Sequence, residues 1–134
     1  MRMDRQGFVY PSYRLRIDRD RASEYVAAQG AQLAVDEAVP PTYMIFLRGE
    51  SQGVDLFVDL DIPRQRALHG GQRYEWFTPI GWDDVFDVTA RVAKITEKAS
   101  RSGPLWFADV EYEYRNAQSR EVALLETTRI IERG

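Results

Sequence analysis

The chain has 134 residues, of which 44% are hydrophobic and 29% charged, as expected of one ordinary globular domain spanning residues 1–134. It contains no cysteine and one histidine, His69, which excludes disulfides, thiol nucleophiles and a metal site built from several histidines of one chain. The formal net charge is −3, and the arginines are interspersed with acidic residues, which argues against nucleic acid as a partner.

No stretch reaches the ~20 apolar residues that a membrane-spanning helix needs. The charged start of the chain leads to no apolar signal segment. We therefore expect a cytoplasmic protein with no membrane partner. The composition indicates no metal or redox cofactor.

The first part of the chain predicts a short strand followed by a helix. Residues 13–17 alternate in the manner of a strand, and Asp18 can cap a helix that runs to about Gln29 and stops at Gly30. Arginines and acidic residues alternate around the start of this helix, which predicts a solvated, salt-bridged surface. These residues are Arg14, Arg16, Arg19, Arg21, Asp18, Asp20 and Glu24.

A second helix is predicted to begin at Pro40, Pro41 and Thr42, because proline is tolerated in the first turn of a helix. Residues 43–47 are apolar on every side, so this helix must be buried all round. Gly49 is its predicted end. The segment that follows, as far as Leu60, fits either a short helix or a strand.

The C-terminal half has the pattern of β-strands. Residues 73–77 are rich in aromatics, residues 86–92 alternate between apolar and polar, and residues 106–115 show the clearest alternation in the chain. Asp83 and Asp84, between the first two of these segments, are predicted turn residues.

A hairpin loop is predicted at residues 116–119, followed by a last strand from about residue 121 to residue 131. Three long antiparallel strands with one polar face form a curved sheet. The apolar helix that begins at Pro41 can cover its other face. This pattern predicts an α+β domain, but it does not select one fold among several.

Two segments carry a resemblance to a known family. Residues 38–44 read Ala-Val-Pro-Pro-Thr-Tyr-Met, similar to the start of the central helix in MaoC-like dehydratase N-terminal domains. Residues 69–76 read His-Gly-Gly-Gln-Arg-Tyr-Glu-Trp and precede Thr-Pro-Ile at residues 78–80. This resembles the next signature of these domains, a His-Gly loop that runs into a strand ending in proline. The resemblance implies a hot-dog fold, in which a curved antiparallel sheet wraps around a central helix.

The family resembled includes (R)-specific enoyl-CoA hydratases and 3-hydroxyacyl dehydratases, whose active members are expected to carry Gly-Asp-x-Asn-Pro-(Leu/Ile)-His before the central helix. The aspartate and the histidine of this segment supply the base that activates water and the acid that protonates the α-carbon. In this chain the segment falls on residues 30–36, with Ala31 at the aspartate position and Asp36 at the histidine position. Both positions are therefore degenerate, and no histidine precedes His69 to replace the missing one.

The resemblance also implies how such a chain works. Hydratases of this family can be built from two hot-dog halves, of which one carries the catalytic pair and the other completes the acyl-CoA tunnel. This chain resembles a free-standing non-catalytic half, so the expected partners are an acyl-CoA thioester and a separate catalytic MaoC-like subunit. Coenzyme A would arrive with the substrate, and no further cofactor is expected. We expect a homodimer or heterodimer, because pairing covers the exposed edge of a single sheet.

The candidate ligand-binding residues are Tyr43, His69, Gly70, Gly71, Gln72 and Arg73. His69 either lies on a loop that lines the thioester tunnel, where the glycines let backbone approach the ligand, or occupies a tight turn. Arg73 either binds a phosphate of coenzyme A or forms an ion pair on an edge strand. Tyr43 is assigned mainly to the buried helix, and Tyr74 and Trp76 are assigned to the core.

Two alternatives remain open. One is a self-sufficient enzyme of the same fold, a thioesterase or a hydratase that uses His69 or Asp36. The other is an acyl-CoA binding or scaffolding module without catalysis. The sequence therefore leaves open whether the chain is an enzyme by itself, although the resemblance implies hydro-lyase chemistry.

Overall fold

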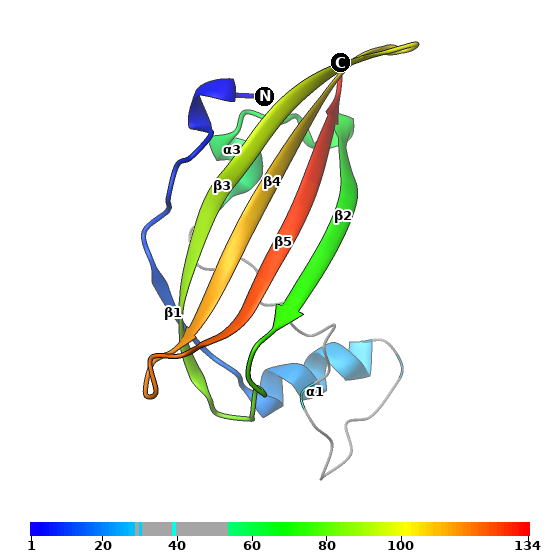
Figure 1. Ribbon diagram of the computed structural model, residues 1–134. Coiled ribbons are helices and arrows are strands. Elements are labelled where there is room, and N and C mark those ends of the chain that lie inside the picture. Colours follow the sequence, from blue (N-terminus) through cyan, green and yellow to red (C-terminus); the bar gives the residue numbers. More distant parts are fainter. Residues whose placement is uncertain (29, 31–38, 40–53) are drawn as a thin grey trace.

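The computed structural model describes residues 1–28, 30, 39 and 54–134. Its main feature is a five-stranded antiparallel sheet with the strand order β1-β3-β4-β5-β2 (Figure 1). The strands are β1 (Tyr13–Arg16), β2 (Ala67–Trp76), β3 (Val85–Ser100), β4 (Gly103–Asn116) and β5 (Val122–Arg133). The helical segments of this part of the chain are η1 (Met3–Arg5), α1 (Arg19–Ala28), α3 (Leu56–Asp59) and η3 (Arg64–Arg66).

The long strands curve together, and α3 and α1 lie toward opposite ends of the sheet (Figure 1). The strands alternate, so that every second side chain is buried on one face, which we call the inner face. Its central members on β3 and β4 are Phe86, Val88, Ala90, Val92, Ala108, Val110, Tyr112 and Tyr114. The alternation predicted over residues 106–115 is therefore confirmed, and burial of these apolar side chains is the main driving force for the sheet.

The helix predicted after Asp18 is also present. The Asp18 carboxylate accepts a hydrogen bond from the backbone N–H of Asp20 at 2.8 Å, which satisfies one of the free N–H groups in the first turn of α1. Gly30 follows the helix with a φ of +78°, a left-handed conformation that glycine adopts without strain. The charged surface at the start of the helix includes ion pairs of Arg16 with Asp18 at 3.0 Å and with Asp83 at 2.8 Å.

The ambiguous segment before Leu60 contains the short helix α3. The Asp55 carboxylate accepts hydrogen bonds from the N–H groups of Phe57 and Val58, so the helix carries its own N-cap. The N-terminal segment is fixed to this helix by Asp59, which receives two hydrogen bonds from the Arg5 guanidinium and one from the Tyr10 hydroxyl.

The His69-Gly70-Gly71 segment was predicted to be a loop or a turn before a strand, and both predictions are wrong. The strand β2 begins at Ala67, so all three residues lie inside it. Its pairing with β5 shifts between His69 and Gly71, which leaves Gly70 as the extra residue of a β-bulge. Paired glycines next to a strand pattern indicate a turn, whereas here Gly70 forms an irregularity within the strand.

Several sequence-based assignments lie outside the described residues. These are the buried helix that begins at Pro41, the candidate ligand residue Tyr43, and the degenerate catalytic positions Ala31 and Asp36.

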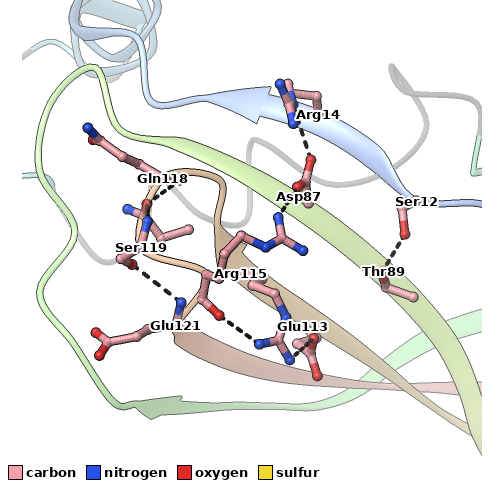
Figure 2. A network of polar contacts seen from close by, with 11 residues as sticks. Ser12, Arg14, Asp87, Thr89, Glu113, Arg115, Gln118, Ser119 and Glu121 are labelled. Carbon is pink, nitrogen blue, oxygen red and sulfur yellow. Dashed lines mark hydrogen bonds and ion pairs between the residues drawn. The ribbon is translucent and has the colours of Figure 1, made fainter.

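The predicted hairpin between β4 and β5 is confirmed, and a polar network holds it (Figure 2). The Asn116 side chain accepts hydrogen bonds from the N–H groups of Gln118 and Ser119 at 2.8 and 3.0 Å. Asp87 of β3 connects this turn to the edge strand β1, because its carboxylate pairs with Arg120 at 2.7 Å and with Arg14 at 3.1 Å. The predicted turn before β3 is present as well, since Asp84 accepts a hydrogen bond from the N–H of Gly81 at 2.7 Å.

Candidate functional site

Polar side chains replace apolar ones where the inner face reaches β5 and β2. Glu126 is 0% exposed and Thr128 is 2% exposed. In the register of the sheet, Gln72 lies opposite Thr128, so both belong to the inner face. We call His69, Gln72, Glu126 and Thr128 the inner polar stripe. It lies at the edge of the described sheet, because β2 pairs there with β5 alone.

The Gln72 side chain organises the exposed end of this stripe. Its Oε1 accepts a hydrogen bond from the Thr128 hydroxyl at 2.8 Å, and His69 Nε2 lies 3.2 Å from the same oxygen. Because that oxygen is an acceptor, the imidazole must donate to it from Nε2. A neutral His69 then has Nδ1 free of a proton. The stripe therefore positions a histidine whose tautomer is set by an amide, not by a carboxylate.

Glu126 occupies the buried end of the stripe. In register it faces Tyr74 of β2 on one side and Tyr112 of β4 on the other. A fully buried carboxyl group needs polar partners, because burial without them costs several kcal/mol. Glu126 is not among the candidate site residues predicted from the sequence. The available signal was a glutamate at an inner position of the alternating series Leu124, Glu126, Thr128 and Ile130.

Neither the Asp/His arrangement of active dehydratases nor a metal site is visible in the described part of the chain. There, His69 makes no ion pair, and no three potential metal ligands come together. Across these same residues, no helix is long and apolar enough to span a membrane.

The opposite, outer face of the sheet carries a hollow of about 450 Å³ beside β2. Its lining includes four of the predicted ligand residues, Gly70, Gly71, Gln72 and Arg73, whereas His69 is not part of it. Charged residues of the neighbouring strands complete the lining, and these are Lys94, Asp109, Glu111 and Arg129. We call this cavity the outer hollow.

The charges around the outer hollow are partly paired. The Arg129 guanidinium donates two hydrogen bonds to the Asp109 carboxylate, at 2.7 and 2.9 Å. These hydrogen bonds hold the pKa of the Asp109 carboxyl below its ordinary value. The edge-strand ion pair considered for Arg73 is not seen within the described ranges, and this side chain is exposed.

The assignment of both Tyr74 and Trp76 to the core is only half right. Tyr74 is half-buried and packs against the core, but Trp76 is 44% exposed. The two rings stack with centroids 6.2 Å apart. Trp76 and the neighbouring Phe77, which is 54% exposed, leave an aromatic surface at the end of the edge strand. Alternation identified the face of the sheet correctly, but it did not identify the edge.

A curved antiparallel sheet with this strand order, and with its apolar face turned inward, defines a hot-dog domain. The family model of the FAS1-like dehydratase domain region matches residues 18–125, which is most of the chain. The chain therefore belongs to this family, and the resemblance to MaoC-like dehydratases noted in its sequence is confirmed.

Solved structures of dehydratases share the fold. A chain of the HadBC (3R-hydroxyacyl-ACP dehydratase) complex from Mycobacterium tuberculosis is 17% identical, with a TM-score of 0.71 over 98% of this chain and 99% of that chain. A chain of the ChsH1–ChsH2 complex from the same organism is 11% identical, with a TM-score of 0.68 over 93% of this chain and 84% of that one.

A MaoC-like dehydratase from Rhodospirillum rubrum is 19% identical, with a TM-score of 0.55 over 96% of this chain and 94% of that chain. At these levels of identity the likeness establishes the fold alone. No curated protein matches the sequence.

Proposed function

We propose that this chain is the non-catalytic subunit of a heteromeric dehydratase, which interconverts 3-hydroxyacyl and enoyl thioesters together with a separate catalytic hot-dog subunit. The observation that carries the proposal is the environment of His69. This is the only histidine of the chain, and its Nε2 faces the amide oxygen of Gln72 instead of a carboxylate. Among the residues that the structure describes, it therefore has no acidic partner of the kind that orients and charges a catalytic imidazole.

The chemistry requires a base and an acid close to the α- and β-carbons of the thioester. In our proposal the partner subunit supplies both. This chain supplies the other wall of the acyl tunnel, for which the inner polar stripe offers His69 and Gln72 on the edge strand β2. The substrate is proposed to arrive as a thioester of coenzyme A, and the reaction needs no further cofactor.

The similar solved structures support a subunit of a complex. The structural likeness extends over nearly all of the HadBC chain, so this chain corresponds to one hot-dog unit of that assembly. Two of the similar structures are described as complexes, HadBC and ChsH1–ChsH2. By analogy, we propose a heterodimer for this chain.

The edge strand β2 is the proposed contact with the partner. On its far side no strand pairs with it among the described residues, and an exposed edge is a template for strand addition. Trp76, Phe77 and Leu68 add exposed apolar area along it, with Leu68 46% exposed. Aromatic side chains in such a position are typical anchors of protein interfaces.

The test is a hydration assay with enoyl-CoA esters, using this chain alone, a candidate catalytic MaoC-like chain from the same organism alone, and the two co-expressed. We expect a stable complex on gel filtration, and hydration by the complex well above that of either chain. Hydration by this chain alone at the same rate would refute the proposal. So would failure of the two chains to form a complex.

A thiol reagent added to the same samples separates the thioesterase alternative, because only thioester hydrolysis releases free coenzyme A. A His69→Ala variant provides a further control within the complex. We expect it to retain most of the hydration rate, since catalysis is assigned to the partner. Loss of the rate to background in this variant would place the chemistry on this chain.

A further inference from the structure

The outer hollow is separate from the face on which we propose that the thioester lies. Gln72 and Thr128 lie opposite one another on the inner face, whereas the next pair along the strands, Arg73 and Thr127, points to the outer face. The strand β2 therefore stands between the inner polar stripe and the outer hollow. A ligand in the hollow cannot take part in dehydration chemistry on the other side of the sheet.

Missing side chains create the hollow. Gly71 lies in register opposite Arg129 and has nothing beyond its backbone to fill the space beside it. At Gly70 a Cβ atom would lie 2.7 Å from the side chain of Ile131, closer than packed atoms approach, so this position must be glycine as the chain is packed. The bulge thus produces a permanent depression, with charged side chains rising around it.

Two transverse rows of the sheet supply those charges. One row runs from Lys94 through Asp109 and Arg129 to Gly71, and the other from Arg91 through Glu111 and Thr127 to Arg73. Asp109 is neutralised by Arg129, and Glu111 is neutralised by Arg91 at 2.9 Å.

Both carboxylates are therefore compensated, and Lys94 and Arg73 remain as positive charges in excess. Each is exposed, and neither forms an ion pair in the part of the chain that the structure describes. They come from β3 and β2, so they stand on opposite sides of the hollow.

We propose that the outer hollow binds a phosphate-bearing anion. Arg73 and Lys94 would neutralise it from the two sides. Arg129, already held in place by Asp109, would present a guanidinium whose orientation is fixed before binding. Guanidinium groups match the geometry of phosphate oxygens, and ammonium groups add a mobile point charge.

The size and charge of the hollow indicate the class of ligand. Its volume lies within the range of about 300–1,000 Å³ that small-molecule sites occupy, which leaves room for a diphosphate or for a phosphate with an organic group attached. The two excess positive charges suit a dianionic group. Either a free phosphate anion or the phosphates of coenzyme A offer this chemistry. The inference does not depend on the proposed function, because it rests on the other face of the sheet.

The test is calorimetric titration of the full chain with inorganic pyrophosphate and, separately, with coenzyme A. We expect both to bind to the wild type, and the double variant Arg73→Gln/Lys94→Gln to bind at least about tenfold more weakly. The matched control is Lys98→Gln/Arg101→Gln, which removes one lysine and one arginine from the exposed end of the β3–β4 hairpin. Its affinity should stay within about twofold of the wild type, since net charge alone contributes little at moderate ionic strength.

A second variant tests whether binding needs the empty volume of the outer hollow, and it leaves the charges around the hollow unchanged. Gly71→Val places a side chain in the hollow with no change in net charge. A Cβ atom at this position would have Arg129 Cβ at 4.0 Å as its nearest neighbour, so the backbone can accept a side chain there. We expect its thermal midpoint to match that of the wild type and its binding of pyrophosphate to be lost.

The proposal fails if the wild type binds neither titrant, if the control double variant weakens binding as much as the test variant, or if Gly71→Val binds normally. Coenzyme A binding at least about tenfold more tightly than pyrophosphate would identify a nucleotide as the occupant, and equal affinities would identify a free phosphate anion. Hydration by the heteromeric complex is measured in a separate assay, so either proposal can fail alone.

Discussion

Gln72 and Thr128 face each other across β2 and β5, and the Thr128 hydroxyl donates to Gln72 Oε1 at 2.8 Å on the inner face of the sheet. This one hydrogen bond fixes the acceptor to which His69 also turns. The bond therefore links the buried Thr128 to the half-buried Gln72, and it can be removed with almost no change in side-chain shape.

We predict that Thr128→Val lowers the free energy of unfolding by about 0.5–1.5 kcal/mol, the usual contribution of a hydrogen bond. Urea denaturation measures it. The matched control is Thr127→Val, one residue away on the outer face, which should change stability by less than about 0.5 kcal/mol. Equal effects of the two substitutions would show that the Gln72 contact contributes nothing specific.

Asp59 should make the fold sensitive to acid. Burial raises the pKa of its carboxyl, but hydrogen bonds from Arg5 and Tyr10 outweigh burial and hold the pKa below its ordinary value. A lowered folded-state pKa contributes stability that is complete above the unfolded value of about 4 and is lost as the pH falls through the folded value. Asp59→Asn should therefore cost about 1–3 kcal/mol at neutral pH and progressively less below pH ~4.

Asp61→Asn serves as the control for this series, because Asp61 is exposed and asparagine tolerates its positive φ of 54°. Denaturation curves between neutral and acidic pH check the prediction. A cost of Asp59→Asn that stayed constant down to strongly acidic pH would contradict it.

Tyr10 should lose its proton only well above the pH at which an ordinary tyrosine titrates. Burial, followed by the hydrogen bond to Asp59 and the charge of that carboxylate, raises its pKa well above the ordinary value. The stability that follows from a raised folded-state pKa is complete below the unfolded value of about 10 and is lost as the pH rises through the folded value. Ultraviolet difference titration of the wild type and of Tyr10→Phe measures this, and the variant should lack one strongly alkaline phase that the wild type shows.

Gly70 gives a prediction about packing, in which a second substitution should restore the stability that the first one removes. A Cβ atom there would meet Cδ1 and Cγ1 of Ile131 at 2.7 Å, so Gly70→Ala should destabilise the fold by about 1–3 kcal/mol. In an Ile131→Ala background both clashing atoms are absent, and the same substitution should cost much less. Gly71→Ala, where the nearest atom lies at 4.0 Å, should be tolerated in either background. A double-mutant cycle without coupling between the first two positions would rule out the clash.

Trp76 provides the test of the proposed subunit contact. Trp76→Arg should weaken the complex with the catalytic chain at least about tenfold, because a charge replaces an aromatic anchor at the edge strand. Val58→Arg is the control, since Val58 is 76% exposed on α3 and lies away from β2. Gel filtration and titration of the two chains separate the outcomes. Equal binding by both variants would move the contact away from this end of β2.

Much of the sheet could be predicted, because alternation is a direct record of which side chains face the core. The residues from Ala108 to Tyr114 alternate so regularly between apolar and polar that the pattern predicts both a strand and the face that it buries. The hairpin at Asn116 was equally readable, since its side chain makes the hydrogen bonds that turn chemistry leads one to expect.

The wrong predictions for the glycine pair and for Trp76 have a common cause. A local sequence pattern does not show which residues are neighbours in space. Glycine is needed at position 70 because the side chain of Ile131, a residue far along the chain, leaves no room for a Cβ atom. Trp76 is exposed because no strand of the described sheet lies beyond β2. The same applies to the candidate site. Glu126 lies between two tyrosines that only the register of three strands brings together, and no spacing in the sequence reports that register.

The bulge at Gly70 also limits what else this edge can join. A strand added along β2 finds regular pairing positions only from Gly71 to Trp76, because the extra residue breaks the repeat beyond that point and increases the local twist. Unrelated chains, or further copies of this one, therefore cannot pair as a regular β-strand along the whole length of the edge. The irregularity that hollows the outer face thereby disfavours open-ended stacking of further chains into fibrils along this edge.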